Sequence, residues 1–318
     1  ATGLNLTASY SPAQALDASE RLHVRGDFYY WNWKLSGTFN PADFYDLFGP
    51  TRISRRGYSL AAQYQRSLLL DGPTSLSYTL RAAGYTGLAT LPEFQNVAAS
   101  SDRLATIYGN LSYKSLRRSL GAIDDELGGT WDAGLRGNYA GGTLHPLVAV
   151  DGSRGFLLPL DHSAIWLRGD AGSFTGGNRN DPFARSYFGG FGNNWVDHGA
   201  VKQFRNTESF PGLEIDQVGG ATYGKAQVEW MSPPLRFRKV GVPSAYLRWA
   251  SLTTFASGLV TDFDDGAARR GYVDAGVQAD LRLITISQFE STFSVGIATA
   301  AGQKIPRSTA LMFSFKLM

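Results

Sequence analysis

The residues of this chain best suited to acid–base chemistry are its four histidines: His23, His145, His162 and His198. Two of them follow an aspartate, in Asp161-His162 and Asp197-His198, and an Asp–His couple can activate water or a serine hydroxyl. Adjacent residues of a strand point to opposite faces, so neither pair is preformed in an extended segment. The G-x-S-x-G motif of many hydrolases does not occur in the sequence. We therefore expect no enzyme, and a hydrolase that uses His162 is kept as an alternative.

Metal ligation has equally little support in the sequence. Carboxylates gather in two polar segments that could bind calcium, at Glu214 and Asp216 and at Asp262, Asp264 and Asp265. Polar loops, however, usually carry such residues because loops are solvated. The chain has no cysteine, which excludes disulfides, thiolate metal sites and a cysteine nucleophile. We expect neither a metal nor a cofactor.

A third group of polar residues lies in a long segment bounded by two glycine pairs. Gly189 and Gly190 precede it, Gly219 and Gly220 end it, and we place the loop itself at 193–220. We expect two strands on either side of this loop to form a hairpin. Loops of such length within a compact domain are usually functional.

The loop contains one arginine, Arg205, and the turn Phe210-Pro211-Gly212, and the strand that follows contains Glu229. If Val228 and Trp230 face outward, alternation places Glu229 on the inner face of the sheet. A buried arginine without a partner is costly, so we expect Arg205 to contact Glu229 and hold the loop inside. The alternative is that Arg205 is a solvated charge at an outer loop tip.

The rest of the chain alternates between apolar and polar residues with a period of two, which is typical of β-strands with two different faces. The pattern predicts about fourteen strands: 4–10, 22–30, 58–64, 76–82, 105–113, 131–139, 143–159, 163–174, 184–192, 221–231, 244–257, 271–283, 291–300 and 308–318. Tight turns are expected at Asp71-Gly72-Pro73, at Gly141-Gly142 and at residues 160–162. We interpret residues 1–318 as one domain, with a short helix possible at 39–49.

Composition favours a membrane barrel over a soluble β-sandwich. The 318 residues include 37 glycines, 7 tryptophans, 15 tyrosines and 19 phenylalanines. Charged residues make up 18% of the chain, below the roughly 25% of soluble domains. Mean hydropathy is −0.18, which fits strands that are apolar on one face. The net charge of +3 is too small to indicate nucleic-acid binding.

Strand length and the aromatic residues point the same way. Many predicted strands exceed the ~5–6 residues usual in soluble sheets and reach the ~9–11 residues needed to cross a bilayer. Aromatic residues near strand ends could form interfacial girdles: Tyr30, Trp31, Trp33, Trp131, Tyr139, Phe174, Tyr187 and Trp230. We therefore predict a closed antiparallel transmembrane β-barrel of 14–16 strands, with the long loop folded into its lumen. The chain starts at Ala1 without an apolar leader, so we expect any export signal to lie outside it.

From Ser186 to Met318 the chain resembles the outer-membrane protein assembly and translocation barrels, also called the bacterial surface antigen family. The resemblance is carried by Gly189-Gly190-Phe191, by Val218-Gly219-Gly220, and by the strand from Gln227 to Pro233, with five strands counted from there to the end. It implies sixteen strands, an inward-folded loop and a lumen-wall acid at Glu229. The chain departs from the pattern because its loop has no Arg-Gly-aromatic tripeptide, and because the next strand lacks the Phe-x-Asp-x-Gly aspartate.

The resemblance also implies a function. Members of that family insert or translocate polypeptides or lipids in the outer membrane of Gram-negative bacteria, usually together with an N-terminal periplasmic part. We therefore expect a bacterial outer-membrane protein that contacts membrane lipids, with unfolded polypeptide as cargo and a periplasmic domain or partner, and with no role for nucleic acid. A barrel that only anchors such a domain and a passive porin-like channel are the alternatives.

Overall fold

The computed structural model describes residues 2–10, 17–40, 56–89, 101–176, 178–191, 200–238, 240–286 and 289–317. Within these ranges every long element is a β-strand, and the helical pieces are single 3-10 turns, η1 (Ala18–Glu20), η2 (Pro182–Ala184) and η3 (Gln203–Arg205). The prediction of an all-β protein is confirmed. The described chain holds no helix that is both long and apolar enough to span a membrane. Residues 41–49 of the predicted helix, together with His198, lie outside the described ranges.

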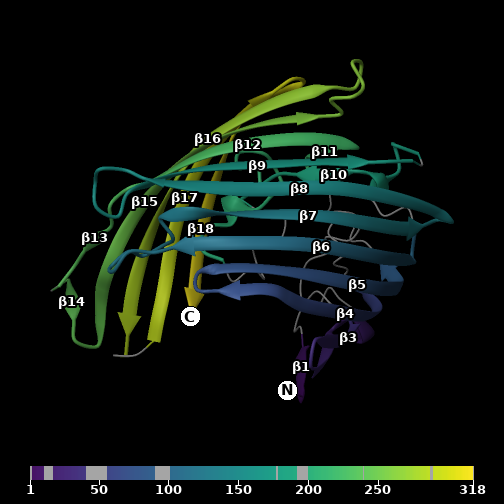
Figure 1. Ribbon diagram of the computed structural model, residues 1–318, viewed down its shortest axis with the longest axis horizontal. Helices are drawn as coiled ribbons and strands as arrows, with labels where there is room; N and C mark the ends of the chain where they lie inside the picture. The colour runs from purple at the N-terminus through teal and green to yellow at the C-terminus, as the bar shows by residue number, and fades with distance from the viewer. Residues whose placement is uncertain are drawn as a thin grey trace.

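Sixteen strands form one antiparallel sheet, and fourteen of them follow one another in chain order (Figure 1). These are β1 (Thr2–Tyr10), β2 (Leu22–Tyr30), β3 (Trp33–Phe39), β4 (Arg56–Asp71), β5 (Thr74–Ala89), β6 (Leu104–Arg117), β7 (Leu127–Ala140), β8 (Thr143–Leu157), β9 (Ala164–Phe174), β12 (Thr222–Met231), β15 (Ala245–Thr261), β16 (Arg270–Thr285), β17 (Phe289–Gly302) and β18 (Ile305–Leu317). The other two, β13 (Leu235–Arg236) and β14 (Gly241–Val242), are short and pair with β15.

Two sequence-based strand assignments are wrong: one strand of the main sheet was omitted and one was added, so the total stayed at fourteen. The predicted list omits β3, because the turn before it uses Trp31 in a left-handed conformation (φ 54°) instead of a glycine. The predicted strand 184–192 does not belong to the main sheet. Only Ser186–Phe188 (β10) is extended there, and it pairs with Val218–Gly220 (β11) in a separate two-stranded sheet. The expected hairpin is therefore absent, since β12 pairs with β9 instead.

The two faces of the sheet differ sharply in chemistry. In β12, Lys225, Gln227 and Glu229 are buried, whereas Val228 and Trp230 are 44% and 39% exposed. The same alternation continues along the sheet, with large apolar side chains exposed in each region: Leu60, Leu80, Ile107, Leu135, Val150, Leu167, Val273, Ile297, Leu311 and Phe313. The exposed face is therefore apolar and the buried face polar, the reverse of the arrangement in a soluble sheet protein.

Six of the eight proposed girdle aromatics lie on the exposed face. Trp31 is the most exposed of them, at 78%, and Tyr30, Trp33, Trp131, Tyr139 and Trp230 are also exposed. The assignment is wrong for Phe174 and Tyr187, which are buried. Phe174 packs with Leu147 and Ala221, so its strand end turns toward the interior.

The sheet curls around one chain segment. The connection from β9 to β12 touches β12 through Arg205, β16 through Val201 and β18 through Gly212, always on the polar face. Strands that are distant in the sheet order therefore face a common interior. The described strand order is an open path, with β1 paired to β2 and β18 paired to β17 at its two ends.

Candidate functional site

The candidate site is the inner loop, defined as residues 175–221 between β9 and β12, of which the structure describes all but residue 177 and residues 192–199. It starts earlier than the predicted loop at 193–220, because β10 and β11 belong to it. The 3-10 turn η2 begins at the cap Asp181, which accepts a hydrogen bond from the Phe183 backbone nitrogen at 2.9 Å. The η3 turn carries Arg205. The small β10–β11 sheet thus forms a base from which the loop extends along the inner face.

The glycines singled out from the sequence lie where the loop backbone comes very close to its neighbours. A Cβ on Gly189 would sit 1.8 Å from the Glu214 carbonyl oxygen. Gly190 forms an antiparallel bridge with Phe210. Gly219 accepts a hydrogen bond from Arg185 through its carbonyl, and Gly220 leaves no room for a Cβ beside Thr261. These positions hold the two ends of the loop close together.

The turn Phe210-Pro211-Gly212 anchors the loop on the wall. Phe210 is fully buried in a cluster of loop and wall residues: Phe188, Leu213, Val218, Tyr223, Leu259, Tyr272 and Ala300. Pro211 is also buried. Gly212 has φ 104°, and its carbonyl accepts a hydrogen bond from the Ser308 hydroxyl of β18 at 2.6 Å. This turn therefore connects the loop to both β12 and the last strand.

The structure places Arg205 directly on Glu229 of β12. Arg205 Nε donates to Glu229 Oε2 at 3.0 Å, and Nη2 donates to Oε1. Arg168 of β9 approaches the same carboxylate, with Nη2 3.2 Å from Oε2. Glu229 has no exposed surface, so two arginines neutralise an acid that would otherwise be buried at great cost.

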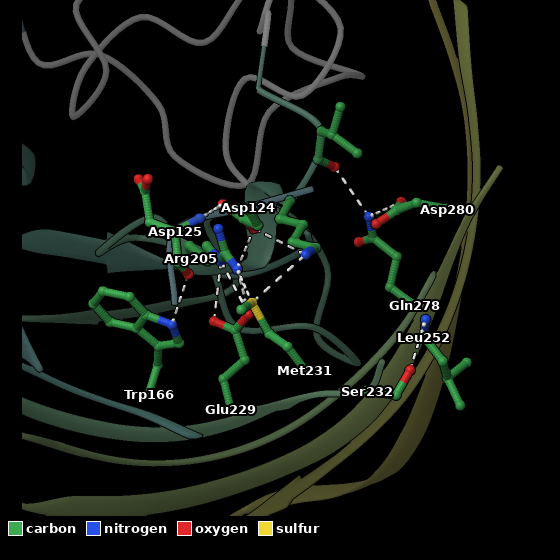
Figure 2. Close-up of polar contacts among 12 residues, drawn as sticks. Asp124, Asp125, Trp166, Arg205, Glu229, Met231, Ser232, Leu252, Gln278 and Asp280 are labelled. Carbon is green, nitrogen blue, oxygen red and sulfur yellow. Dashed lines mark hydrogen bonds and ion pairs between the residues drawn. The ribbon is translucent and has the colours of Figure 1, made fainter. Parts of the chain in front are cut away.

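A second acid completes this ion-pair network, and it comes from an unexpected element. Asp124, in the β6–β7 connection, lies 2.8 Å from Arg205 Nη2 and 3.0 Å from Lys202 Nζ. Figure 2 shows Arg205 between Asp124 and Glu229. Burial alone would raise the pKa of Asp124, but the charges of Arg205 and Lys202 outweigh it and hold that pKa well below its usual range. Burial would likewise lower the pKa of Arg205, and Glu229 and Asp124 raise it instead. We call Arg205, Lys202, Glu229, Arg168 and Asp124 the latch.

Further polar contacts hold the loop along the wall beyond the latch. Lys225 Nζ donates to the carbonyl oxygens of Asn206, Thr207 and Ser209 at 2.7–3.0 Å. The Gln278 amide donates to the Val201 carbonyl oxygen at 3.1 Å. Phe204 stacks on Phe255 with ring centroids 4.3 Å apart. Wall side chains thus donate hydrogen bonds to carbonyl oxygens of the loop backbone, which water would supply in an exposed loop.

The histidines that the structure describes do not form a catalytic arrangement. Ser119 Oγ lies 3.2 Å from His162 Nδ1, and Glu126 Oε1 lies 2.9 Å from the same nitrogen. A catalytic triad needs the serine and the acid on opposite ring nitrogens, so this cluster ties the β6–β7 connection to the β8–β9 turn instead. His23 bonds the Asn40 carbonyl oxygen, and His145 is buried 3.8 Å from Asp181. No two described histidines share a site.

The possible calcium ligands are also used in other contacts. Asp262 pairs with Arg185 at 3.0 Å, and Asp264 pairs with Arg179 at 2.7 Å and accepts from Thr222. Both pairs join the β15–β16 connection to the start of the inner loop. Among the described residues, no group of three or more histidines, aspartates or glutamates is arranged to hold a metal.

Sequence reasoning missed Asp124 and Lys202. Arg168 and Lys225 lie on the inner face, as the alternation of their strands predicts. Asp124 lies in an irregular connection with nothing to mark it, and the resemblance pointed to an acid on the strand after β12.

In comparisons with known proteins, no protein-family model matches the chain and no curated protein is significantly similar to it.

Proposed function

We propose that this chain is a transmembrane β-barrel of a bacterial outer membrane, closed by pairing of β1 with β18. The apolar exposed face supports this proposal, because such a surface is stable in lipid and prone to aggregate in water. The fourteen long strands are an even number, so β1 and β18 would meet antiparallel and both chain ends would lie at one end of the barrel. Closure would also remove two strand edges that are otherwise open to aggregation.

The connections suggest an orientation for the barrel. The longest connections, β3–β4, β5–β6 and the inner loop, all leave from the end opposite to the chain termini, although the short turns β7–β8 and β17–β18 also lie there. Outer-membrane barrels have short periplasmic turns and longer outer loops. We therefore place the chain ends in the periplasm, where a periplasmic domain or partner would join the barrel.

We further propose that the barrel serves in polypeptide or lipid insertion or translocation, with the inner loop as a releasable plug. The observation that carries this proposal is the latch, in which one loop arginine is held by two acids, Glu229 of β12 and Asp124 of the β6–β7 connection. An always-open channel needs no such attachment. The resemblance noted in the sequence supports the same function, as does the anchoring of Phe210 and Gly212.

Single-channel conductance in planar bilayers tests the proposal. We expect low conductance for the intact protein and a clear increase for Glu229→Gln and for deletion of residues 193–217, because both free the lumen. Large conductance of the intact protein would instead indicate a passive porin-like channel. A chain that is monodisperse in buffer without detergent would contradict the membrane location itself. The hydrolase alternative gains no support, because Ser119 and Glu126 share one nitrogen of His162.

A further inference from the structure

A large basic cavity lies beside the latch, at the end of the sheet that carries the chain termini. Its volume is about 910 Å³, and it lies between the β6–β7 connection, the link from β12 to β15, the inner faces of β15–β17 and the inner loop. We call it the basic vestibule and define it by its arginines: Arg118, Arg205, Arg236, Arg238, Arg248 and Arg282. Lys202 adds a seventh cation, and the lining contains three acids, Asp124, Asp280 and Glu290.

The internal ion pairs leave positive charge unbalanced. Arg248 and Arg282 both bind Glu290, with Arg248 Nη1 at 2.7 Å. Asp124 already forms ion pairs with Lys202 and Arg205 of the latch. Arg236 and Arg238 form no ion pair with any residue that the structure describes. Two guanidinium groups are therefore available on the link between β12 and β15 to bind an anionic ligand.

The wall of the vestibule is shaped by a β-bulge. The pairing of β15 with β16 shifts between Leu247 and Trp249, so Arg248 has no partner residue opposite it. As a result two consecutive residues, Arg248 and Trp249, line the same cavity, where regular alternation would place one of them outside. Bulges that redirect side chains are common next to functional sites. Phe237, on the link from β12 to β15, adds a second aromatic residue to the lining of the vestibule.

We propose that the basic vestibule binds an acidic, extended polypeptide segment that carries an apolar side chain. Arginine and tryptophan together are the residues most enriched at the energetic centres of protein interfaces. The guanidinium groups would pair with carboxylates, and Trp249 and Phe237 would contact the apolar side chain. A membrane lipid fits less well, because the cavity opens on the polar inner face, away from the apolar exposed face of the sheet.

This inference rests on the proposed function in one respect: that function implies that the peptide is either cargo or a segment of a periplasmic partner. Binding itself needs neither translocation nor a bilayer. The test can therefore be made on the full chain in a non-ionic detergent, and it reports on the vestibule even if conductance experiments refute the plug.

The probe is a fluorescein-labelled peptide of alternating glutamate and serine with one central leucine, followed by fluorescence anisotropy. We expect saturable binding that weakens as salt screens the charges. The double variant Arg236→Glu/Arg238→Glu should reduce affinity roughly tenfold or more, since it reverses two exposed charges at the site. The matched control Arg269→Glu/Arg270→Glu changes the last residue of the β15–β16 connection and the first residue of β16, at the opposite end of the sheet, and should bind like the unaltered chain.

A second variant tests the aromatic part of the site. Trp249→Ala should weaken binding of the leucine peptide and leave binding of an all-serine-and-glutamate peptide nearly unchanged. The proposal is overturned if the lysine counterpart of the peptide binds equally well, or if the Arg236/Arg238 variant binds as tightly as the control variant. It is also overturned if a soluble short-chain phosphatidylglycerol binds the vestibule and the acidic peptide does not.

Discussion

Two buried carboxylates on the inner face of the same sheet, Glu229 and Asp27, are neutralised in very different ways. Asp27 of β2 is contacted by Arg25 at 3.0 Å, by Lys34 at 3.3 Å and by the Ser36 hydroxyl at 2.7 Å, all from its own hairpin. Glu229 is contacted by Arg168 from the neighbouring strand β9 and by Arg205 from the inner loop. The first network is local in sequence, and the second joins segments that only the folded chain brings together.

This difference indicates which strands of the wall contact the inner loop. Under the loop, the inward side chains of β12 and β15 are nearly all buried. In β1 and β3, the pattern of exposure is much more open, although the strands alternate in the same way. We infer that polar residues of β1–β3 stabilise their own hairpins, whereas those of β9, β12, β16 and β18 hold the inner loop in place.

The largest effect should follow from breaking the long-range network. Glu229→Gln leaves Arg168 and Arg205 facing each other without their shared acid, and we expect a loss of about 3–5 kcal/mol in unfolding free energy. A double-mutant cycle with Arg205→Met should show a coupling of about 1–3 kcal/mol. Thermal unfolding in detergent, followed by circular dichroism, measures both quantities.

The control for that cycle is Asp27→Asn combined with Lys34→Met, an ion pair within one hairpin. Its coupling should be smaller, because Lys34 is partly exposed and Arg25 and Ser36 remain on the aspartate. Zero coupling between Arg205 and Glu229 would show that the latch does not hold the loop.

The sequence predicted one contact of the long-range network, between Arg205 and Glu229, and missed another, between Arg205 and Asp124. Alternation around Val228 and Trp230 was enough to place Glu229 on the inner face, and one arginine in a long loop was enough to suggest its partner. The role of Asp124 could not be predicted, because its position depends on the curvature of the whole sheet, which brings the β6–β7 connection against η3. Nothing in the local pattern of residues 118–126 encodes that curvature.

Two errors in the strand assignments have local causes. The run Ser186-Tyr187-Phe188 resembles a wall strand, yet both Tyr187 and Phe188 are buried, because β10 packs inside the sheet. Alternation cannot distinguish a strand with one exposed face from a short strand buried on both sides. The strand β3 was missed because its preceding turn, Trp31-Asn32, contains neither glycine nor proline.

A pH titration should show that the stability of the inner loop depends on pH differently from the stability of the wall. Burial, and then the nearby charge of Glu208, raise the pKa of Asp216 to about 7. The folded loop therefore holds this proton more tightly than the unfolded chain, whose aspartates titrate near 3.9. Its stabilising contribution is complete below that value and is lost as the pH rises through about 7. We expect a decrease on the order of 2–3 kcal/mol between pH 4 and pH 8.

Protease digestion of the loop at a series of pH values measures this effect. Cleavage within residues 200–217 should accelerate at pH 8, and Asp216→Asn should abolish the dependence. Cleavage that is equally slow at pH 8, or slower, would show that Asp216 does not couple the loop to pH.

Packing provides a third contrast between the two regions. A Cβ on Gly212 would lie 2.4 Å from the Ala300 backbone nitrogen, in a left-handed backbone conformation, whereas a Cβ on Gly84 of β5 meets nothing within 4 Å. We expect Gly212→Ala to cost about 1–3 kcal/mol and to raise conductance, since overpacking pushes the loop from β17. Gly84→Ala should be close to neutral in both assays. Equal effects of the two substitutions would mean that Gly212 is not a contact point.

The smallest effect is expected for the local network itself. Asp27→Asn keeps an acceptor for the Ser36 hydroxyl and removes the charge that attracts Arg25 and Lys34, whose side chains are 57% and 25% exposed. Exposed cations regain hydration when they lose a partner, so the loss of unfolding free energy should be about 1 kcal/mol or less. Conductance should not change, because this network makes no contact with the described part of the inner loop. If Asp27→Asn opened the channel as Glu229→Gln is expected to, the division of the wall into a loop-holding part and a self-stabilised part would be wrong, and the inner loop would have to be coupled to β2 through the curvature of the sheet.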